Sequence, residues 1–122
     1  MEPTEHPAPE GAEMPALDEL DLEGMWQRLE AGQKARAVRE VYETQQKKVI
    51  EMQRLHAAKI DELAVAVVRA RGTLERGLAE EAERMRMGEV EPLRTEIQRM
   101  GQEIAEANAL LTAYQTIGRG II

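Results

Sequence analysis

The side chains best suited to chemistry are two histidines and many carboxylates, because the sequence has no serine and no cysteine. The usual activated nucleophiles are therefore missing. His6 lies in a proline-rich start, and His56 lies close to Arg54 and Lys59, a poor setting for a metal ion or a general base. The Glu-x-x-His pairs that bind metals in helical bundles do not occur. We expect no catalytic residue, no metal site and no cofactor.

Other patterns that resemble functional motifs have plainer explanations. Glu80, Glu81 and Glu83 stand beside Arg84 and Arg86, which is typical of solvated charge on a helix. The glycines lack the lysine and the strand-to-helix setting of a phosphate-binding loop. The sequence therefore favours a non-enzymatic protein.

The composition indicates long helices rather than a compact globule. Phenylalanine is absent, and the aromatic residues are Trp26, Tyr42 and Tyr114. The net charge of −7 makes nucleic acid an unexpected ligand. No apolar run is long enough to insert into a membrane, and Glu2 and Glu5 stand where a signal peptide needs basic and apolar residues. We expect a location in the cytoplasm or within a virion or other macromolecular assembly.

The stretch from Val90 to Ile121 has the clearest periodicity in the chain. Apolar residues alternate in steps of three and four, which predicts one helix face held against a partner helix, as in a coiled coil. The stripe consists of Val90, Leu93, Ile97, Met100, Ile104, Ala107, Leu111, Tyr114 and Ile121.

The stretch from Gln33 to Met87 predicts a second, longer helix. Its apolar residues fall into two sets spaced by eleven, which indicates a straight or slightly right-handed course. These sets are Val41, Met52, Leu63, Leu74 and Met85, and Val38, Val49 and Ile60. From Leu63 to Val68, a run that includes Val67, the helix is apolar on nearly every side, so more than one neighbour should enclose it.

The best signal for a break between these helices is Met87 to Pro92. Gly88 suits the residue after a helix end, and Pro92 suits the first turn of the next helix. We therefore predict a helical hairpin over 33–122, with helices at about 33–87 and 92–117. A single long rod kinked at Pro92 is the alternative. In the hairpin, residues 33–58 have no partner within the chain.

The first 32 residues are strongly acidic and divide into two parts. Residues 1–15 are proline-rich, and we expect a disordered, flexible arm. Residues 16–32 form a short amphipathic segment that either packs on the hairpin or docks into a hydrophobic groove of a partner. The docking residues would be Leu17, Leu20, Met25, Trp26 and Leu29.

Together these patterns predict an all-α fold: a long helical hairpin or coiled coil with a disordered acidic N-terminal arm. Its function would be structural, with the chain forming homo-oligomers within a larger assembly such as a phage virion, tail or head appendage, or a secretion-type machine. The alternative is an oligomeric adaptor or assembly chaperone that binds a client through Leu17–Leu29. Oligomerisation or core residues would be Val41, Met52, Leu63, Val67, Leu74, Leu93, Ile97, Met100, Ile104, Leu111 and Tyr114.

Overall fold

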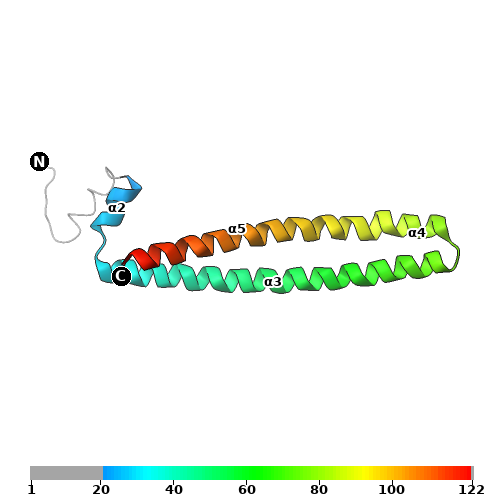
Figure 1. Ribbon diagram of the computed structural model, residues 1–122, viewed down its shortest axis with the longest axis horizontal. Helices are drawn as coiled ribbons and strands as arrows, with labels where there is room; N and C mark the ends of the chain where they lie inside the picture. Colours follow the sequence, from blue (N-terminus) through cyan, green and yellow to red (C-terminus); the bar gives the residue numbers. More distant parts are fainter. Residues whose placement is uncertain (1–20, 122) are drawn as a thin grey trace, which may run out of the picture.

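The computed structural model describes residues 21–121, and these residues form an all-α fold without strands. The element order is α2 (Leu22–Arg28), α3 (Ala31–Glu75), α4 (Ala79–Met85), η2 (Arg86–Val90) and α5 (Glu91–Ile121). The expected flexible arm at residues 1–15, together with Leu17 and Leu20, lies outside the described residues. Two long rods lie side by side, and the chain folds back between them (Figure 1).

The first two described helices begin at polar caps. The side chain of Asp21 accepts a hydrogen bond from the backbone N–H of Gly24 at the start of α2. At the start of α3, the backbone N–H of Glu30 donates to the side chain of Gln33 at 2.9 Å. From there α3 runs for 45 residues, which is about 67 Å at the usual rise per residue.

The turn between the rods lies at residues 76–78. The backbone N–H of Gly77 donates to the carbonyl of Leu74, and the N–H of Leu78 donates to the carbonyl of Thr73. These two bonds are the Schellman pattern that ends a helix, and it requires a left-handed residue. Gly77 supplies that residue with a φ of 82°, which costs glycine nothing.

The predicted turn at Met87–Pro92 is therefore wrong, as are the helix bounds 33–87 and 92–117. Across Met87–Pro92 the second rod continues through η2, a π-helical turn. The backbone N–H of Glu91 donates to the carbonyl of Arg86, five residues earlier. Pro92 follows in the first turn of α5, where its missing N–H is tolerated. The proline thus fits inside a continuous rod without the break that its presence suggested.

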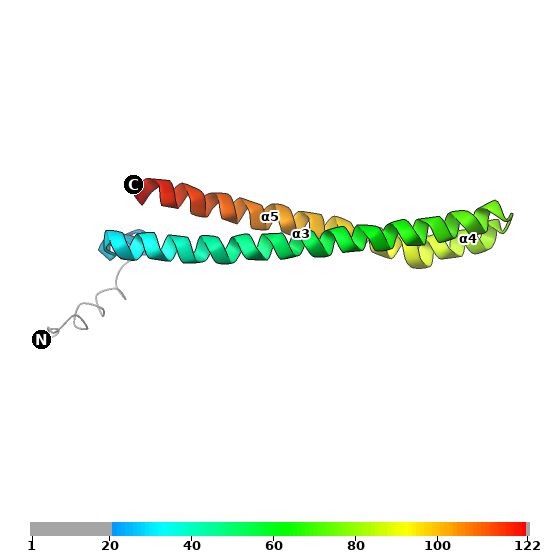
Figure 2. The same cartoon turned by 90° about the horizontal axis from the view of Figure 1, so that it is seen from below.

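Because the turn lies at residues 76–78, α3 lies along the second rod, which consists of α4, η2 and α5, over its whole length. The two rods cross at a shallow angle, with α5 on one side of α3 and α4 on the other (Figure 2). Cross-helix contacts join Gln45 to Ala107, Lys59 to Glu96 and Arg69 to Glu89. Residues 33–58, which were expected to lack a partner within the chain, lie along α5.

The face of α3 turned to the second rod, which we name the covered stripe, follows alternating steps of three and four. Its residues are all buried or half-buried: Val38, Tyr42, Gln45, Val49, Met52, His56, Lys59, Leu63, Ala66, Ala70 and Thr73. The eleven-residue repeat does not describe this face, because its members Val41 and Leu74 are exposed. Both rods therefore present the same seven-residue period to each other, which lets two helices stay in contact along their length.

The π turn has a cause in the spacing of the second rod. From Ile121 back to Val90, the stripe that faces α3 keeps steps of three and four, but the next two buried or half-buried positions, in α4, are Met85 and Ala82. The step from Met85 to Val90 is five residues, one more than the pattern allows. A π turn takes up one extra residue while the helix keeps the same face toward its partner.

The core between the rods is thin. Val49, Ala66, Ala82 and Ala107 are the buried apolar residues among residues 21–121, and Gln45 is buried with them. Three of these apolar residues are alanines, and none of the larger side chains described is fully buried. Two helices alone enclose little apolar volume, so most of the larger aliphatic side chains stay in partial contact with water.

Candidate interaction surfaces

Polar side chains fix the register between the two rods. The side-chain amide of Gln45 donates to the carbonyl of Ala107 at 3.0 Å, and both residues are buried. Farther along, an N–H on Nε2 of His56 donates to the carbonyl of Ile97 over 3.2 Å. The His56 ring lies against Gly101, where an added Cβ would be 3.8 Å from Nε2, an ordinary van der Waals contact. His56 thus has a structural contact, and its Nε2 is engaged by the backbone.

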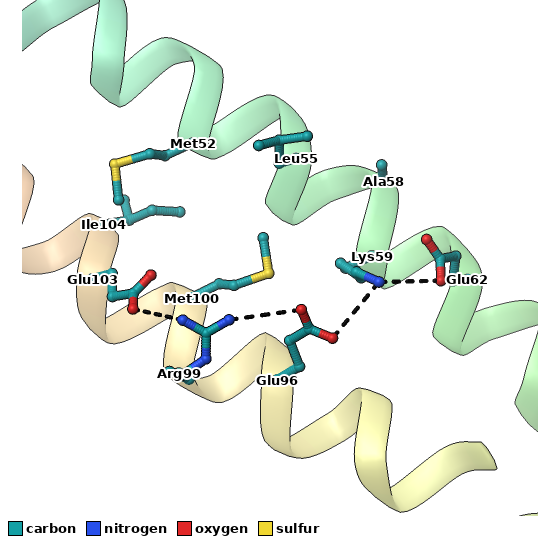
Figure 3. Close-up of a pocket in the computed structure, with 10 residues that line it drawn as sticks. All are labelled: Met52, Leu55, Ala58, Lys59, Glu62, Glu96, Arg99, Met100, Glu103 and Ile104. Atoms are coloured by element: carbon teal, nitrogen blue, oxygen red, sulfur yellow. Dashed lines mark hydrogen bonds and ion pairs between the residues drawn. The ribbon is translucent and has the colours of Figure 1, made fainter.

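A shallow groove of about 360 Å³ runs along one flank of the rods near Lys59 (Figure 3). Lys59 Nζ lies 3.5 Å from Glu62 and 3.6 Å from Glu96 on α5. Arg99 continues the chain of charges, lying 3.6 Å from Glu96 and 2.6 Å from Glu103. Opposite charges alternate along this flank, so each carboxylate of Figure 3 has a cation within reach.

This groove resembles a stabilising charge network more than a reactive centre. Its ten lining residues include no histidine, and apolar side chains such as Leu55 and Met100 form the rest of its wall. Exposed pairs of this kind contribute at most about 1 kcal/mol each. No group of three potential metal ligands occurs within residues 21–121.

Two carboxyl groups have lowered pKa values, and in both cases the cause is an arginine on the same rod. A hydrogen bond from Arg54 lowers the pKa of the Glu51 carboxyl, and a hydrogen bond from Arg86 lowers that of Glu83. Both pairs are one helical turn apart on exposed surface, where such charges stabilise a helix modestly.

The structure places the predicted oligomerisation or core residues in two classes. One class is half-buried between the rods and comprises Met52, Leu63, Leu93, Ile97, Met100, Ile104, Leu111 and Tyr114. The other class comprises Val41, Val67 and Leu74, which are 40%, 42% and 52% exposed. The hairpin therefore uses α5's apolar stripe fully, whereas it leaves part of α3's apolar surface to water.

Much of that uncovered surface forms a second regular face, which we name the open stripe. It also follows steps of three and four, and all of its residues are exposed: Ile50, Gln53, Ala57, Ile60, Ala64, Val67, Arg71 and Leu74. Sequence reasoning missed Ile50, Ala57 and Ala64 as members of one face. The signal was present in their spacing, but the eleven-residue sets mixed residues of the open and covered stripes.

The segment predicted to dock a partner lies beside the C-terminal end of α5. Trp26 is half-buried, and Lys34 Nζ lies 4.8 Å from the centre of its ring, a cation–π contact. Met25 is half-buried as well, while Leu29 is 39% exposed. A shallow hollow is lined by Trp26, Ile117 and Leu22, and Leu22 is 81% exposed. Part of this segment thus contacts its own chain.

Comparisons with known proteins returned no match to a protein family, to a characterised protein or to a solved structure. Within the described part of the chain, no helix is both long and apolar enough to cross a membrane.

Proposed function

We propose that this chain is a non-enzymatic structural protein that forms homo-oligomers through its helices, as a component of a larger assembly. The observation that carries the proposal is the open stripe on α3. Ile50, Ile60 and Val67 are 59%, 44% and 42% exposed, whereas Ala66, next to Val67 in the chain, is 2% exposed. The branched aliphatic side chains that α3 leaves exposed would be buried by a further neighbour, and their burial would stabilise the assembled state.

The size of that gain favours assembly. Full burial of a valine, leucine or isoleucine side chain is worth about 1.5 to 3 kcal/mol. Several such side chains, each about half exposed, lie along one face of α3. Contiguous apolar surface of this kind marks interaction sites in soluble proteins. Coiled-coil packing between chains, with its regular spacing of three and four, would suit the stripe.

Light scattering on the purified full chain tests the proposal. We expect a mass that is a multiple of 13.7 kDa at micromolar concentration. A mass of one chain across the whole concentration range would overturn the proposal, because a lone rod would then be stable with its apolar stripe in water.

An adaptor or assembly chaperone is the second candidate, and the exposure of Leu22 and Leu29 on the acidic segment favours it. Such a protein would capture a client through residues 17–29 while its helices oligomerise. Replacement of Trp26 by alanine separates the two functions. Loss of a co-purifying protein with an unchanged oligomer mass would favour the adaptor, and retention of that protein would count against it.

A further inference from the structure

We propose that the open stripe binds the open stripe of a second copy of this chain, with the two α3 helices antiparallel. This inference deepens the proposed function and rests on it. The stripe runs for 25 residues from Ile50 to Leu74, about 36 Å of helix. Its spacing is that of a helix with a partner, and all of its residues are exposed, although Val67, Arg71 and Leu74 line a shallow hollow that α4 and η2 also line.

The first argument is the match of side-chain size in the antiparallel register centred on residue 62. There Ile60 lies opposite Ala64 of the second copy, and Ala57 lies opposite Val67. Two-fold symmetry repeats each pair with the roles exchanged. A branched residue thus meets an alanine in every central layer, and alternation of large and small side chains lets two helices interlock.

The second argument is the match of the polar positions. The same register places Gln53 opposite Arg71 of the second copy, so the guanidinium donates to the amide carbonyl. A shift of one heptad would place Arg71 against Ile60, or Gln53 against Ala64. A parallel pair would place Arg71 against Arg71, which like charges oppose. One register and one orientation therefore pair the two polar residues of the stripe with each other.

The third argument is the position of the second rod. On the helical wheel the open stripe lies about 100° from the covered stripe. Two α3 helices that pair through the open stripe therefore bring their α5 helices to the same side, as in a four-helix bundle.

The test changes Gln53, which is exposed, so the hairpin itself is left intact. In the antiparallel register Gln53→Glu gains an ion pair with Arg71, whereas Gln53→Lys opposes it. With two such pairs per dimer, we expect the dissociation constant to change by a factor of about 2 to 30 in each direction. The double variant Gln53→Lys with Arg71→Glu should restore association. In a parallel pair, Gln53→Glu would instead weaken binding by placing two carboxylates together.

Cysteine cross-linking gives an independent readout in this cysteine-free chain. Asp61 lies on the flank of the stripe, next to the proposed axis, so Asp61→Cys should join two copies through a short bis-maleimide. Arg71→Cys should not, because residues 71 of the two copies lie about 27 Å apart along the helices. Cross-linking of both variants would indicate a parallel pair and overturn the proposal.

The outcomes separate this inference from the proposed function. A wild-type chain that stays monomeric removes the proposed function. An oligomeric wild type whose dissociation constant is unchanged by all Gln53 variants overturns the open-stripe pairing alone, and would assign another surface or another occupant to the interface.

Discussion

The two stripes of α3 use different residues for the same spacing. The covered stripe contains Gln45, His56 and Lys59, together with small residues such as Ala66, and it contacts the second rod along its length. The open stripe contains two isoleucines, a valine and a leucine, and it contacts water. The hairpin therefore combines polar contacts with the packing of Val49, Leu63 and Ala66, while part of α3's branched apolar surface stays exposed.

This difference would let α3 contact two neighbours, the second rod of its own chain and the second copy that we propose. Polar side chains in a contact stripe specify register at some cost in stability. An apolar stripe supplies association energy but less register information, except where Gln53 and Arg71 interrupt it. Deletions that rotate a stripe away from its partner, and charges placed in a buried stripe, should therefore have the largest effects on stability.

The most severe change predicted is a one-residue deletion in α5. Removal of Ala105 rotates the following residues by about 100°, which turns Leu111 and Tyr114 away from α3. We expect the loss of more than about 3 kcal/mol of stability, measured by urea unfolding with circular dichroism.

Deletion of Gly88 is the matched control, and it should have the opposite outcome. Gly88 lies in the π turn, where one residue fewer restores the step from Met85 to the next covered position to four. We expect the shortened rod to be a continuous α-helix of equal or slightly higher stability, by about 0.5 to 1 kcal/mol. Equal damage from the two deletions would contradict our explanation of the π turn.

Adjacent residues allow a direct comparison of the stripes. Val49 is 4% exposed in the covered stripe, and Ile50 is 59% exposed in the open stripe. Val49→Asp buries a charge and should cost about 3 kcal/mol or more in urea unfolding. Ile50→Asp should change the stability of dilute protein by less than about 1 kcal/mol, yet weaken association in light scattering. Similar unfolding curves for the two variants would show that the stripes do not differ.

The turn that makes the covered stripe possible depends on Gly77. A side chain at its φ of 82° is strained, so Gly77→Ala should cost about 1 to 2 kcal/mol in thermal or urea unfolding. Gly72 is inside α3 with nothing within 4 Å of an added Cβ. Gly72→Ala should therefore stabilise the chain by about 0.5 to 1 kcal/mol. If Gly77→Ala and Gly72→Ala both stabilised or both destabilised the chain, the turn at residues 76–78 would be contradicted.

The smallest effect concerns acid titration near the turn. Arg86 lowers the pKa of Glu83 below its ordinary value of 4.5. A group with a lowered folded pKa stabilises the fold above its unfolded pKa, and this contribution disappears as pH falls through the folded pKa. Glu83→Gln should therefore reduce stability slightly at neutral pH and leave it unchanged at strongly acid pH. If Glu83→Gln reduced stability more at acid than at neutral pH, the result would contradict a stabilising ion pair between Glu83 and Arg86.

The fold class and the stripe of α5 follow from the sequence, because strict spacing of apolar residues over many turns leaves one choice of face. The turn could not be read in the same way. Pro92 is a stronger break signal than Gly77 in isolation, and only the tertiary match between rods decides which one the chain uses. Lys59 was also missed as a contact residue, because a polar side chain does not stand out in a pattern of apolar residues.

The central claim is that a second copy covers the open stripe, and sedimentation equilibrium on a matched pair of variants tests it most directly. Val67 lies in the open stripe at 42% exposure, and Val65 lies two residues away, outside both stripes, at 53% exposure. Equilibrium mass is independent of shape, which matters for so elongated a molecule. We predict that Val67→Lys shifts the mass towards 13.7 kDa, while Val65→Lys keeps the mass of the wild-type oligomer. Equal masses for the two variants at every concentration would contradict the claim.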